Sequence, residues 1–354
     1  MGVIDRYREK RPIYESLSQR LRHLLHDIVK ENGIELHAIE ARAKTLDSFA
    51  EKTNRPGKAY TNPLEEIVDL CGLRVILYYQ EDVDRLSDIL REEFNVDHLR
   101  SVDKRDELRS DQFGYISVHL VCQLQENRAA LPEWRAYRGL HAEIQVRTVL
   151  QHAWASISHA LQYKREFEVP EQFSRQLMRI AGLLELSDEQ FSALRKKTDV
   201  LRKDIDRRLA KSDLRMVINS VSLDQFVSSS DFVLQIVNTA RNVGFSIVGD
   251  SGAAQIVAMC QRFGISELSE LSLLLEKFLL NALKFFKAFA DVQKEHGMEI
   301  ENITGGKDHW SAVAVVAMKY KSEEEGKFIV KDNVWSDLYL DEVRLAAMRA
   351  LATP

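Results

Sequence analysis

Hydrophobic and polar residues alternate from Ala142 to Thr148, in the sequence AEIQVRT. A period of two is typical of a strand with one buried face, so Ile144 and Val146 are predicted to face the core. The opposite face carries a carboxylate, an amide and a guanidinium in a row, on Glu143, Gln145 and Arg147. The pattern therefore predicts a strand with one face made of groups that bind ligands.

A helical period follows this strand directly. Thr148 is a candidate N-cap, and Trp154, Ile157 and Leu161 recur at the spacing of a buried helix face. The same helix presents the polar residues Gln151, His152, Ser156, His159 and Lys164. A polar strand face that continues into a polar helix face predicts a cleft.

Two more segments show the alternation of strands. Ile67–Tyr79 has Asp69 just before the predicted strand and Arg74 within it. Two carboxylates from separate elements, Asp69 and Glu143, can hold one Mg²⁺, which needs few protein oxygens when phosphates and water supply the rest. The alternative for Asp69 and Arg74 alone is a structural ion pair at a strand edge.

The third alternating segment, Phe113–Val121, enters its strand through Gly114. One of its faces carries Tyr115, Ser117 and His119. A tyrosine ring at the mouth of a strand can stack on a nucleobase.

Helical periods predict helices over Tyr14–Glu31, Val83–Glu93 and Glu171–Lys211. Leu194–Lys211 mixes basic residues with aspartates, which favours a solvated helix face over the alternative of RNA contact. The serines at 228–230 and the glycines between 244 and 252 predict a linker or a loop-rich junction.

Beyond this junction the chain is predicted to be mostly helical, over Ala253–Phe263, Glu267–Glu295, Ser311–Lys319 and Asn333–Leu351. The second of these helices is apolar on most of its circumference. It is expected either to form the buried centre of a helical bundle or to provide a protein-contact surface.

Composition agrees with an intracellular protein of more than one domain. The 354 residues, 45% of them hydrophobic, are enough for a sizeable core and predict two domains. The net charge of −5 argues against wholesale coating of nucleic acid but allows a local basic cleft. Three widely separated cysteines suggest neither a disulfide framework nor a zinc site. No signal segment or membrane span is predicted, so we expect a cytoplasmic location.

Four motifs resemble, in order and spacing, the synthetase domain of the RelA/SpoT family, which makes the alarmones ppGpp and pppGpp. They are RAKTLDSFAEK (Arg42–Lys52), DLCGLR (Asp69–Arg74), GYISVH (Gly114–His119) and the segment from EIQVRT to HALQYK (Glu143–Lys164). The resemblance covers roughly Tyr7 to Arg195, about half of the chain.

The resemblance implies transfer of pyrophosphate from ATP to the 3′ hydroxyl of GDP or GTP. It implies an α+β fold, a mixed β-sheet flanked by helices of nucleotidyltransferase type. The residues that match the ATP-binding positions of the family are Arg42, Lys44, Lys52 and Arg74. Asp69 matches the Mg²⁺ ligand, and Glu143 matches the acid that shares the metal or deprotonates the attacking hydroxyl. The sequence leaves both roles of Glu143 open.

For the acceptor, the resemblance implies that Tyr115 stacks on the guanine. The other residues expected to bind the acceptor are His119, Gln145, His152, His159 and Lys164. Alternatively, His119 is a core histidine and Gln145 fills a sheet edge. Ile116 and Val118 make the acceptor loop less polar than in many members of the family. Either Lys104, Arg105 and Arg109 replace the missing charges, or they are solvated.

Residues 1–215 are thus expected to form a synthetase domain, and residues 220–354 a helical domain that forms a homo-oligomer or binds a protein partner. Two other functions remain open. A toxin-like relative would pyrophosphorylate the 3′ end of tRNA, with the C-terminal region as a neutralising or sensing module. A non-enzymatic binding protein would keep only the fold.

Overall fold

The computed structural model describes residues 2–55, 57, 59–107, 117–163, 171–247, 256–257, 260–261, 264–297, 299, 304–305, 346 and 349. The chain divides into two compact units, Met1–Arg195 and Lys196–Pro354. Each unit has a hydrophobic cluster of its own. We predicted a boundary at residues 215–220, whereas the structural division falls inside helix α8 (Glu171–Leu209).

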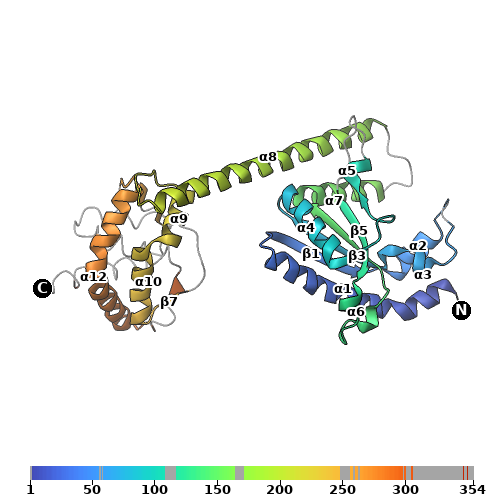
Figure 1. The fold of residues 1–354 in the computed structure, drawn as a ribbon, viewed down its shortest axis with the longest axis horizontal. Coiled ribbons are helices and arrows are strands. Elements are labelled where there is room, and N and C mark those ends of the chain that lie inside the picture. The colour runs from blue at the N-terminus through green and yellow to red at the C-terminus, as the bar shows by residue number, and fades with distance from the viewer. Residues whose placement is uncertain are drawn as a thin grey trace. The chain divides into compact units, whose positions relative to one another are not determined.

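The first unit is built on a six-stranded mixed sheet (Figure 1). Its strands are β1 (Leu36–Ala43), β2 (Cys71–Leu77), β3 (Phe94–Val96), β4 (Val102–Asp103), β5 (Val118–Leu124) and β6 (Ala142–Thr148). The order across the sheet is β1-β2-β6-β5-β3, with β4 also paired to β5. Only β2 and β6 run parallel, and the other pairs are antiparallel. The predicted mixed sheet is confirmed.

Helices connect these strands. The α-helices of the unit are α1 (Val3–Glu31), α2 (Leu46–Thr53), α3 (Pro63–Glu66), α4 (Gln80–Glu93), α5 (Lys104–Glu107), α6 (Glu126–Ala129), α7 (Val149–Tyr163) and the first part of α8. Two short 3-10 helices cover Val68–Leu70 and Arg135–Tyr137.

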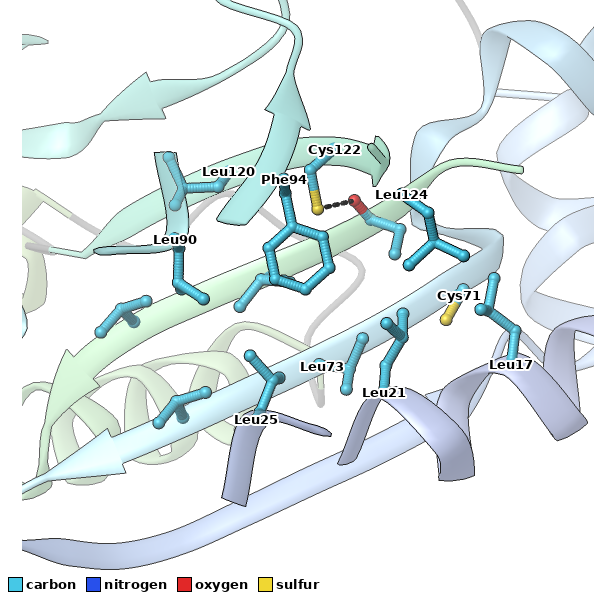
Figure 2. Close-up of a cluster of buried hydrophobic side chains, with 14 of the residues drawn as sticks. Leu17, Leu21, Leu25, Cys71, Leu73, Leu90, Phe94, Leu120, Cys122 and Leu124 are labelled. Atoms are coloured by element: carbon cyan, nitrogen blue, oxygen red, sulfur yellow. Dashed lines mark hydrogen bonds between the residues drawn. The ribbon is translucent and has the colours of Figure 1, made fainter. Parts of the chain in front are cut away.

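One face of the sheet is the core of this unit. Leu17, Leu21 and Leu25 recur every fourth residue on α1 and pack with Leu73 of β2 and Phe94 of β3 (Figure 2). Helix α4 adds Leu86 and Leu90 to the same cluster. Each buried leucine contributes about 1.5–3 kcal/mol through the hydrophobic effect. The apolar residues of β2, β5 and β6 therefore pack against α1 and α4. The alternating polar residues of these strands lie on the opposite face of the sheet.

Two buried polar contacts hold the first part of α8 to the unit. The Thr148 hydroxyl donates to Asp188 Oδ2 at 2.7 Å, and both side chains are buried. Arg195 pairs with buried Asp82 at 2.5 Å and lies over the Tyr79 ring, 4.4 Å from its centroid. The helix predicted from Glu171 onwards is confirmed. Its contact with Asp82 lies outside the four sequence motifs, and its contact with Thr148 lies at the start of α7.

The second unit contains α9 (Ser220–Ser229), α10 (Asp231–Val243) and α12 (Leu268–Glu295), with a parallel pair of short strands, β7 (Ser246–Ile247) and β8 (Thr304–Gly305). Its core includes an aromatic group from α12 with Phe245, whose ring stacks on that of Phe289 at 5.3 Å between centroids. The buried centre predicted for Glu267–Glu295 is confirmed at Phe285, Phe286 and Phe289. Contact with another protein through these helices stays a prediction.

Two sequence predictions need correction. The serines at 228–230 are not a linker, because Ser229 ends α9 and Ser230 is the N-cap of α10, its hydroxyl accepting from the Val233 amide at 3.4 Å. Leu36–Ala43 forms a strand, β1, which we had not predicted, and the basic stretch Arg42–Lys52 lies mostly in α2. Ser311–Lys319 lies outside the described residues, as does most of Ala253–Phe263 and Asn333–Leu351. None of the described helices is long and apolar enough to cross a membrane.

Candidate active site

The open face of the sheet carries its polar residues in register. In one row across β1, β2, β6 and β5, Glu40 lies opposite Arg74, Arg74 beside Gln145, and Gln145 opposite His119. In the next row Arg42 lies opposite Gly72, and Gly72 beside Glu143. Residues two apart in the sequence thus gather on one surface, as the alternation predicted.

A cleft of about 280 Å³ opens on this face. It is lined by Glu40, Ala41, Arg42, Asp69, Gly72, Leu73, Arg74, Glu143 and Gln145. Gly72 lies between Arg42 and Glu143, and a β-carbon built on it would meet only two backbone carbonyls, at 3.9 and 4.0 Å. The absence of a side chain at Gly72 therefore leaves open space next to the charged residues.

Asp69 lies in the 3-10 helix that immediately precedes β2. Lys44 Nζ contacts its Oδ2 at 2.6 Å, and Lys52 Nζ, from α2, contacts its Oδ1 at 2.9 Å. Burial alone would raise the pKa of the Asp69 carboxyl, but the hydrogen bonds and charges of the two lysines lower it below its ordinary value. Asp69 is thus a partly buried carboxylate held ionised by two cations.

The backbone of Lys44 is fixed by residues of α1 and by the loop before β2. The Tyr7 hydroxyl, on α1, donates to the Lys44 carbonyl at 2.7 Å, and Arg11 Nε donates to the same oxygen at 3.3 Å. The Lys44 amide donates to the Leu70 carbonyl at 3.0 Å. Tyr7 is itself fully buried, with its ring stacked on Phe49. These contacts bring Lys44 to Asp69 across 25 residues of sequence.

Glu143 is held differently. His119 Nδ1 lies 3.2 Å from its Oε1, and Gln145 Nε2 donates to its Oε2 at 3.0 Å. Burial alone would raise the pKa of the Glu143 carboxyl, but the hydrogen bond and charge of His119 outweigh burial and lower it. The side chains predicted to bind the acceptor, His119 and Gln145, therefore contact the predicted catalytic acid in this structure.

Arg74, predicted to bind ATP, pairs with Glu40 at 3.0 Å. Glu40 lines the cleft, yet the sequence analysis missed it because β1 was not recognised as a strand. Its position two residues before Arg42 is the signal that would have placed it on the same face. Glu40 adds a third carboxylate to the cleft, next to one of its cations.

Two of the remaining predicted site residues are not brought to this cleft. His152 and His159 lie on α7, and neither is among the described residues that line the cleft. Burial and the nearby charges of Arg147 and Arg74 lower the pKa of His152 below its ordinary value. Tyr115, Lys164 and Arg109 lie outside the described residues.

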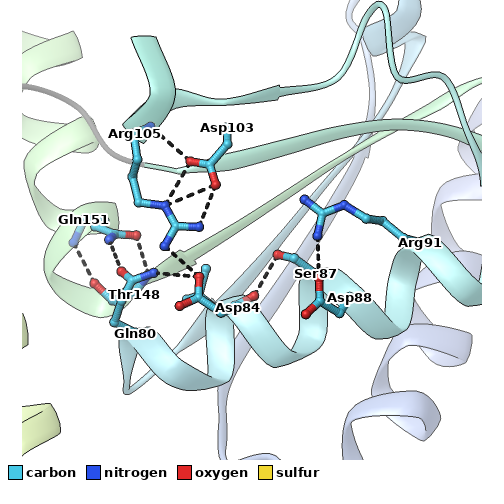
Figure 3. A network of polar contacts seen from close by, with 10 residues as sticks. Gln80, Asp84, Ser87, Asp88, Arg91, Asp103, Arg105, Thr148 and Gln151 are labelled. Atoms are coloured by element: carbon cyan, nitrogen blue, oxygen red, sulfur yellow. Dashed lines mark hydrogen bonds and ion pairs between the residues drawn. The ribbon is translucent and has the colours of Figure 1, made fainter. Parts of the chain in front are cut away.

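Arg105, considered as a replacement cation for nucleotide phosphates, is engaged inside the unit. It pairs with Asp84 of α4 at 2.6 Å and with Asp103 at 2.5 Å (Figure 3). Asp84 accepts from Gln80 at 3.4 Å, and Gln80 accepts from Gln151 at 2.7 Å. Arg105 is thus part of a polar network that reaches the start of α7.

At that point the chain forms the cap predicted for Thr148. Its hydroxyl accepts from the Gln151 amide at 3.1 Å, and its own amide donates to Gln151 Oε1 at 2.9 Å. This reciprocal pair is a capping box, which fixes the direction in which β6 turns into α7. The contacts that run from Arg105 through Asp84 and Gln80 to Gln151 in Figure 3 therefore hold the end of the strand that carries Glu143.

The donor set of the cleft fits a magnesium ion. Within the part of the chain that the structure describes, no group of three His, Cys, Asp or Glu side chains is arranged to hold a metal ion. Mg²⁺, however, binds through one or two carboxylates and leaves its other positions to water and phosphate oxygens. Asp69 and Glu143 line the same cleft and supply such oxygens.

Comparisons with known proteins converge on one family. Residues 41–168 match the model described as the region found in RelA/SpoT proteins. Two curated relatives from Bacillus subtilis (strain 168) are both 29% identical to this chain. GTP pyrophosphokinase YwaC matches over 163 residues, covering 45% of this chain and 74% of the relative. GTP pyrophosphokinase YjbM matches over 160 residues, covering 44% and 71%.

Among solved structures, the crystal structure of small alarmone synthetase 1 from Bacillus subtilis is 25% identical, with a TM-score of 0.46, and the match covers 55% of this chain and 98% of that one. The matched stretch 41–168 contains the last three residues of β1 and all of β2, β5 and β6, and with them every described residue that lines the cleft except Glu40. Residues 41–168 of this chain are a RelA/SpoT domain.

Proposed function

We propose that this protein transfers pyrophosphate from ATP to the 3′ hydroxyl of GDP or GTP. The observation that carries the proposal is the cleft on the open face of the sheet, where Glu143 and Asp69 are both held ionised beside Arg42 and Arg74. The RelA/SpoT domain and the names of the two curated relatives support it.

In this reaction the 3′ oxygen of the acceptor attacks the β-phosphorus of ATP. A bond forms between them, the bond from the β-phosphorus to the oxygen shared with the α-phosphate breaks, and AMP leaves with the electron pair. The hydroxyl proton goes to the Glu143 carboxylate, which acts as the general base. An ionised carboxylate at neutral pH, as the lowered pKa of Glu143 implies, is able to accept it.

Arg42, Lys44, Lys52 and Arg74 neutralise the triphosphate of ATP in this proposal. Such transfers depend mainly on positioning and on cations that meet the developing negative charge. Lys44, Lys52 and Arg74 contact carboxylates in the structure, namely Asp69 and Glu40. When ATP binds, its phosphates would replace these carboxylates as the partners of the three cations.

Asp69 and Glu143 are the residues that would hold Mg²⁺. When bound, the ion would neutralise charge on the transferring phosphates. Because both oxygens of Asp69 are in contact with lysines, the lysines would turn from Asp69 to phosphate as the ion binds.

The acceptor is assigned to the Glu143 end of the cleft, with Tyr115 stacked on its base. His119, Gln145, His152, His159 and Lys164 remain the proposed contacts of its ribose and phosphates. His119 and Gln145 both contact Glu143 in the structure. An acceptor hydroxyl that binds next to Glu143 would therefore lie close to both side chains.

The test uses the full chain with Mg²⁺ and ATP labelled at the β-phosphate. GDP, GTP, bulk tRNA or no acceptor is added, and the products are separated. We expect label on the guanine nucleotide. Label that appears only on tRNA would replace the nucleotide acceptor with a tRNA end, and no transfer to any acceptor would overturn the proposal. Glu143→Gln serves as the control for contaminating enzymes.

A further inference from the structure

Each oxygen of Glu143 receives one hydrogen-bonding group from a neighbour on the open face of the sheet. His119, on β5, lies 3.2 Å from Oε1, and Gln145, two residues along β6, donates to Oε2 at 3.0 Å. An ionised carboxylate has about four acceptor sites. The remaining lone pairs stay available for an incoming group.

The His119 contact is set by a second residue. An ionised carboxylate only accepts, so His119 must donate from Nδ1 to Glu143. On the other side of the ring, Ser117 Oγ lies 2.7 Å from Nε2 and can pair with it as donor or as acceptor. Ser117 is 1% exposed, and its carbonyl accepts from the Lys104 amide at 3.0 Å. The contact with the Ser117 hydroxyl therefore holds the ring in the orientation in which Nδ1 faces Glu143.

The Gln145 contact is set in the same way. A side-chain amide can rotate by half a turn, which would present its oxygen to Glu143 and repel the carboxylate. Arg147 has only donors, and its guanidinium donates to Gln145 Oε1 at 2.9 Å. Arg147 is 3% exposed. It therefore holds the amide with its NH₂ group facing Glu143.

From these contacts we infer that Ser117 and Arg147 are positioning residues, which fix the Glu143 carboxylate for the attack through His119 and Gln145. The inference rests on the proposed function, because it assigns a use to the orientation of Glu143. It adds two buried residues, one on each side of the carboxylate, that do not line the cleft themselves. A misplacement of about 1 Å in such a group is enough to lower a rate by about 10²-fold.

The first experiment measures kcat and KM for Arg147→Met, Arg147→Lys and Ser117→Ala in the full chain, with ATP and the acceptor that gains label in the transfer assay. We expect kcat to fall by roughly 10- to 100-fold in Arg147→Met and Ser117→Ala, with both KM values within about twofold of the original. Arg147→Lys, which keeps a donor, should recover part of the loss. A folded Arg147→Met protein with unchanged kcat, or with only KM raised, contradicts the inference.

Matched controls separate positioning from packing. Ser87→Ala removes an equally buried serine whose hydroxyl donates to the Val83 carbonyl at 2.7 Å, away from the cleft. Arg91→Met removes an arginine of α4 that pairs with Asp88. Both should keep kcat, and melting temperatures show whether each variant is folded. A loss in Ser87→Ala equal to that in Ser117→Ala would mean that packing alone explains the effect.

A second measurement does not depend on activity. Crystal structures of the original chain and of Arg147→Met should differ in the direction of the Gln145 amide and in the rotamer of Glu143. If wild-type protein transfers no pyrophosphate, the proposed function fails while this structural result still decides the positioning. An unchanged Gln145–Glu143 contact in Arg147→Met overturns the inference even if the enzyme is active.

Discussion

Within one cleft, Asp69 accepts two lysine ammonium groups, whereas Glu143 contacts a histidine ring and accepts from a side-chain amide. Both carboxyl groups have a lowered pKa, but for different reasons. The cations on Asp69 are groups that phosphates also bind, so a ligand can take them over. The partners of Glu143 are neighbouring side chains of the same sheet, His119 and Gln145. The cleft thus has one carboxylate whose partners can be exchanged for a ligand, and one that is held in a fixed orientation.

Asp188, a buried carboxylate that does not line the cleft, shows how the pKa changes without such partners. Asp188 is buried, and the Thr148 hydroxyl donates to it without bringing a charge. Burial raises its pKa to about 6, and the hydrogen bond from Thr148 offsets only part of that rise. The low pKa values in the cleft therefore come from the partners of Asp69 and Glu143, not from exposure to water.

The largest effect should come from removing either carboxylate of the cleft. Asp69→Ala and Glu143→Ala are each expected to lower the transfer rate by at least ~10³, since each removes a main electrostatic group from the site. Single-turnover rates with saturating substrates measure this, and circular dichroism checks the fold. Near-normal turnover in Asp69→Ala would remove Asp69 from the metal site.

Tyr115 tests which end of the cleft receives the acceptor. Base stacking on an aromatic ring is worth about 1–3 kcal/mol, so Tyr115→Ala should weaken acceptor use by roughly one to two powers of ten. Tyr115→Phe keeps the ring and should be mild. The measurement is kcat/KM for the acceptor at saturating ATP. If Tyr115→Ala instead impairs ATP and spares the acceptor, the two nucleotide sites must be exchanged.

Removal of Lys44, one of the two lysines that contact Asp69, should change the KM for ATP more than kcat. Charged hydrogen bonds contribute about 1.5–3 kcal/mol, so Lys44→Ala is expected to raise KM for ATP by about tenfold or more. Arg42→Ala should likewise act on ATP. Lys30→Ala, at the exposed end of α1, is the control. A selective loss of acceptor binding in Lys44→Ala or Arg42→Ala would show that these cations belong to the other end.

Substitution of Asp188 should have the smallest effect on the transfer rate. Its main effect should be a pH-dependent change in the stability of the protein. Because its pKa is raised in the folded protein, folding favours the protonated form, and stability falls as the pH rises from about 4 through about 6. Asp188→Asn removes the charge and should stabilise the protein by about 2 kcal/mol at pH 7.5 but little at pH 4.5. Melting temperatures at both pH values test this, with exposed Glu189→Gln as control. An equal shift at both pH values would rule out the titration of Asp188.

Local patterns were sufficient for much of the fold. The alternation in Ala142–Thr148 predicted β6, the helical period predicted α12 and most of α8, and Thr148 was identified as a cap. Strand β1 escaped because a register shift between Leu36 and Ala38 interrupts its alternation, and because its alanines give little hydrophobic contrast. Secondary structure is therefore predictable from the sequence where the hydrophobic period is unbroken.

The sequence predicted several residues that the structure brings to one cleft, but it did not predict their contacts. The sequence indicated Asp69, Glu143 and the cations, yet it did not show that Lys44 and Lys52 both reach Asp69, or that Glu40 reaches Arg74. These pairs join residues 17 to 34 positions apart, so they depend on how the strands align. The Thr148–Asp188 contact spans 40 positions and likewise depends on tertiary packing.

Helix α1 precedes the matched stretch 41–168, yet it covers the apolar face of the sheet and holds the Lys44 carbonyl through Tyr7. A fragment cut at the limits of the family region would lose that cover and expose a broad apolar surface, which promotes aggregation. In hydrogen exchange, the amides of β1 and β2 should open together with α1, as one cooperative unit. We therefore expect the smallest autonomously folding fragment to include α1 and to be larger than residues 41–168.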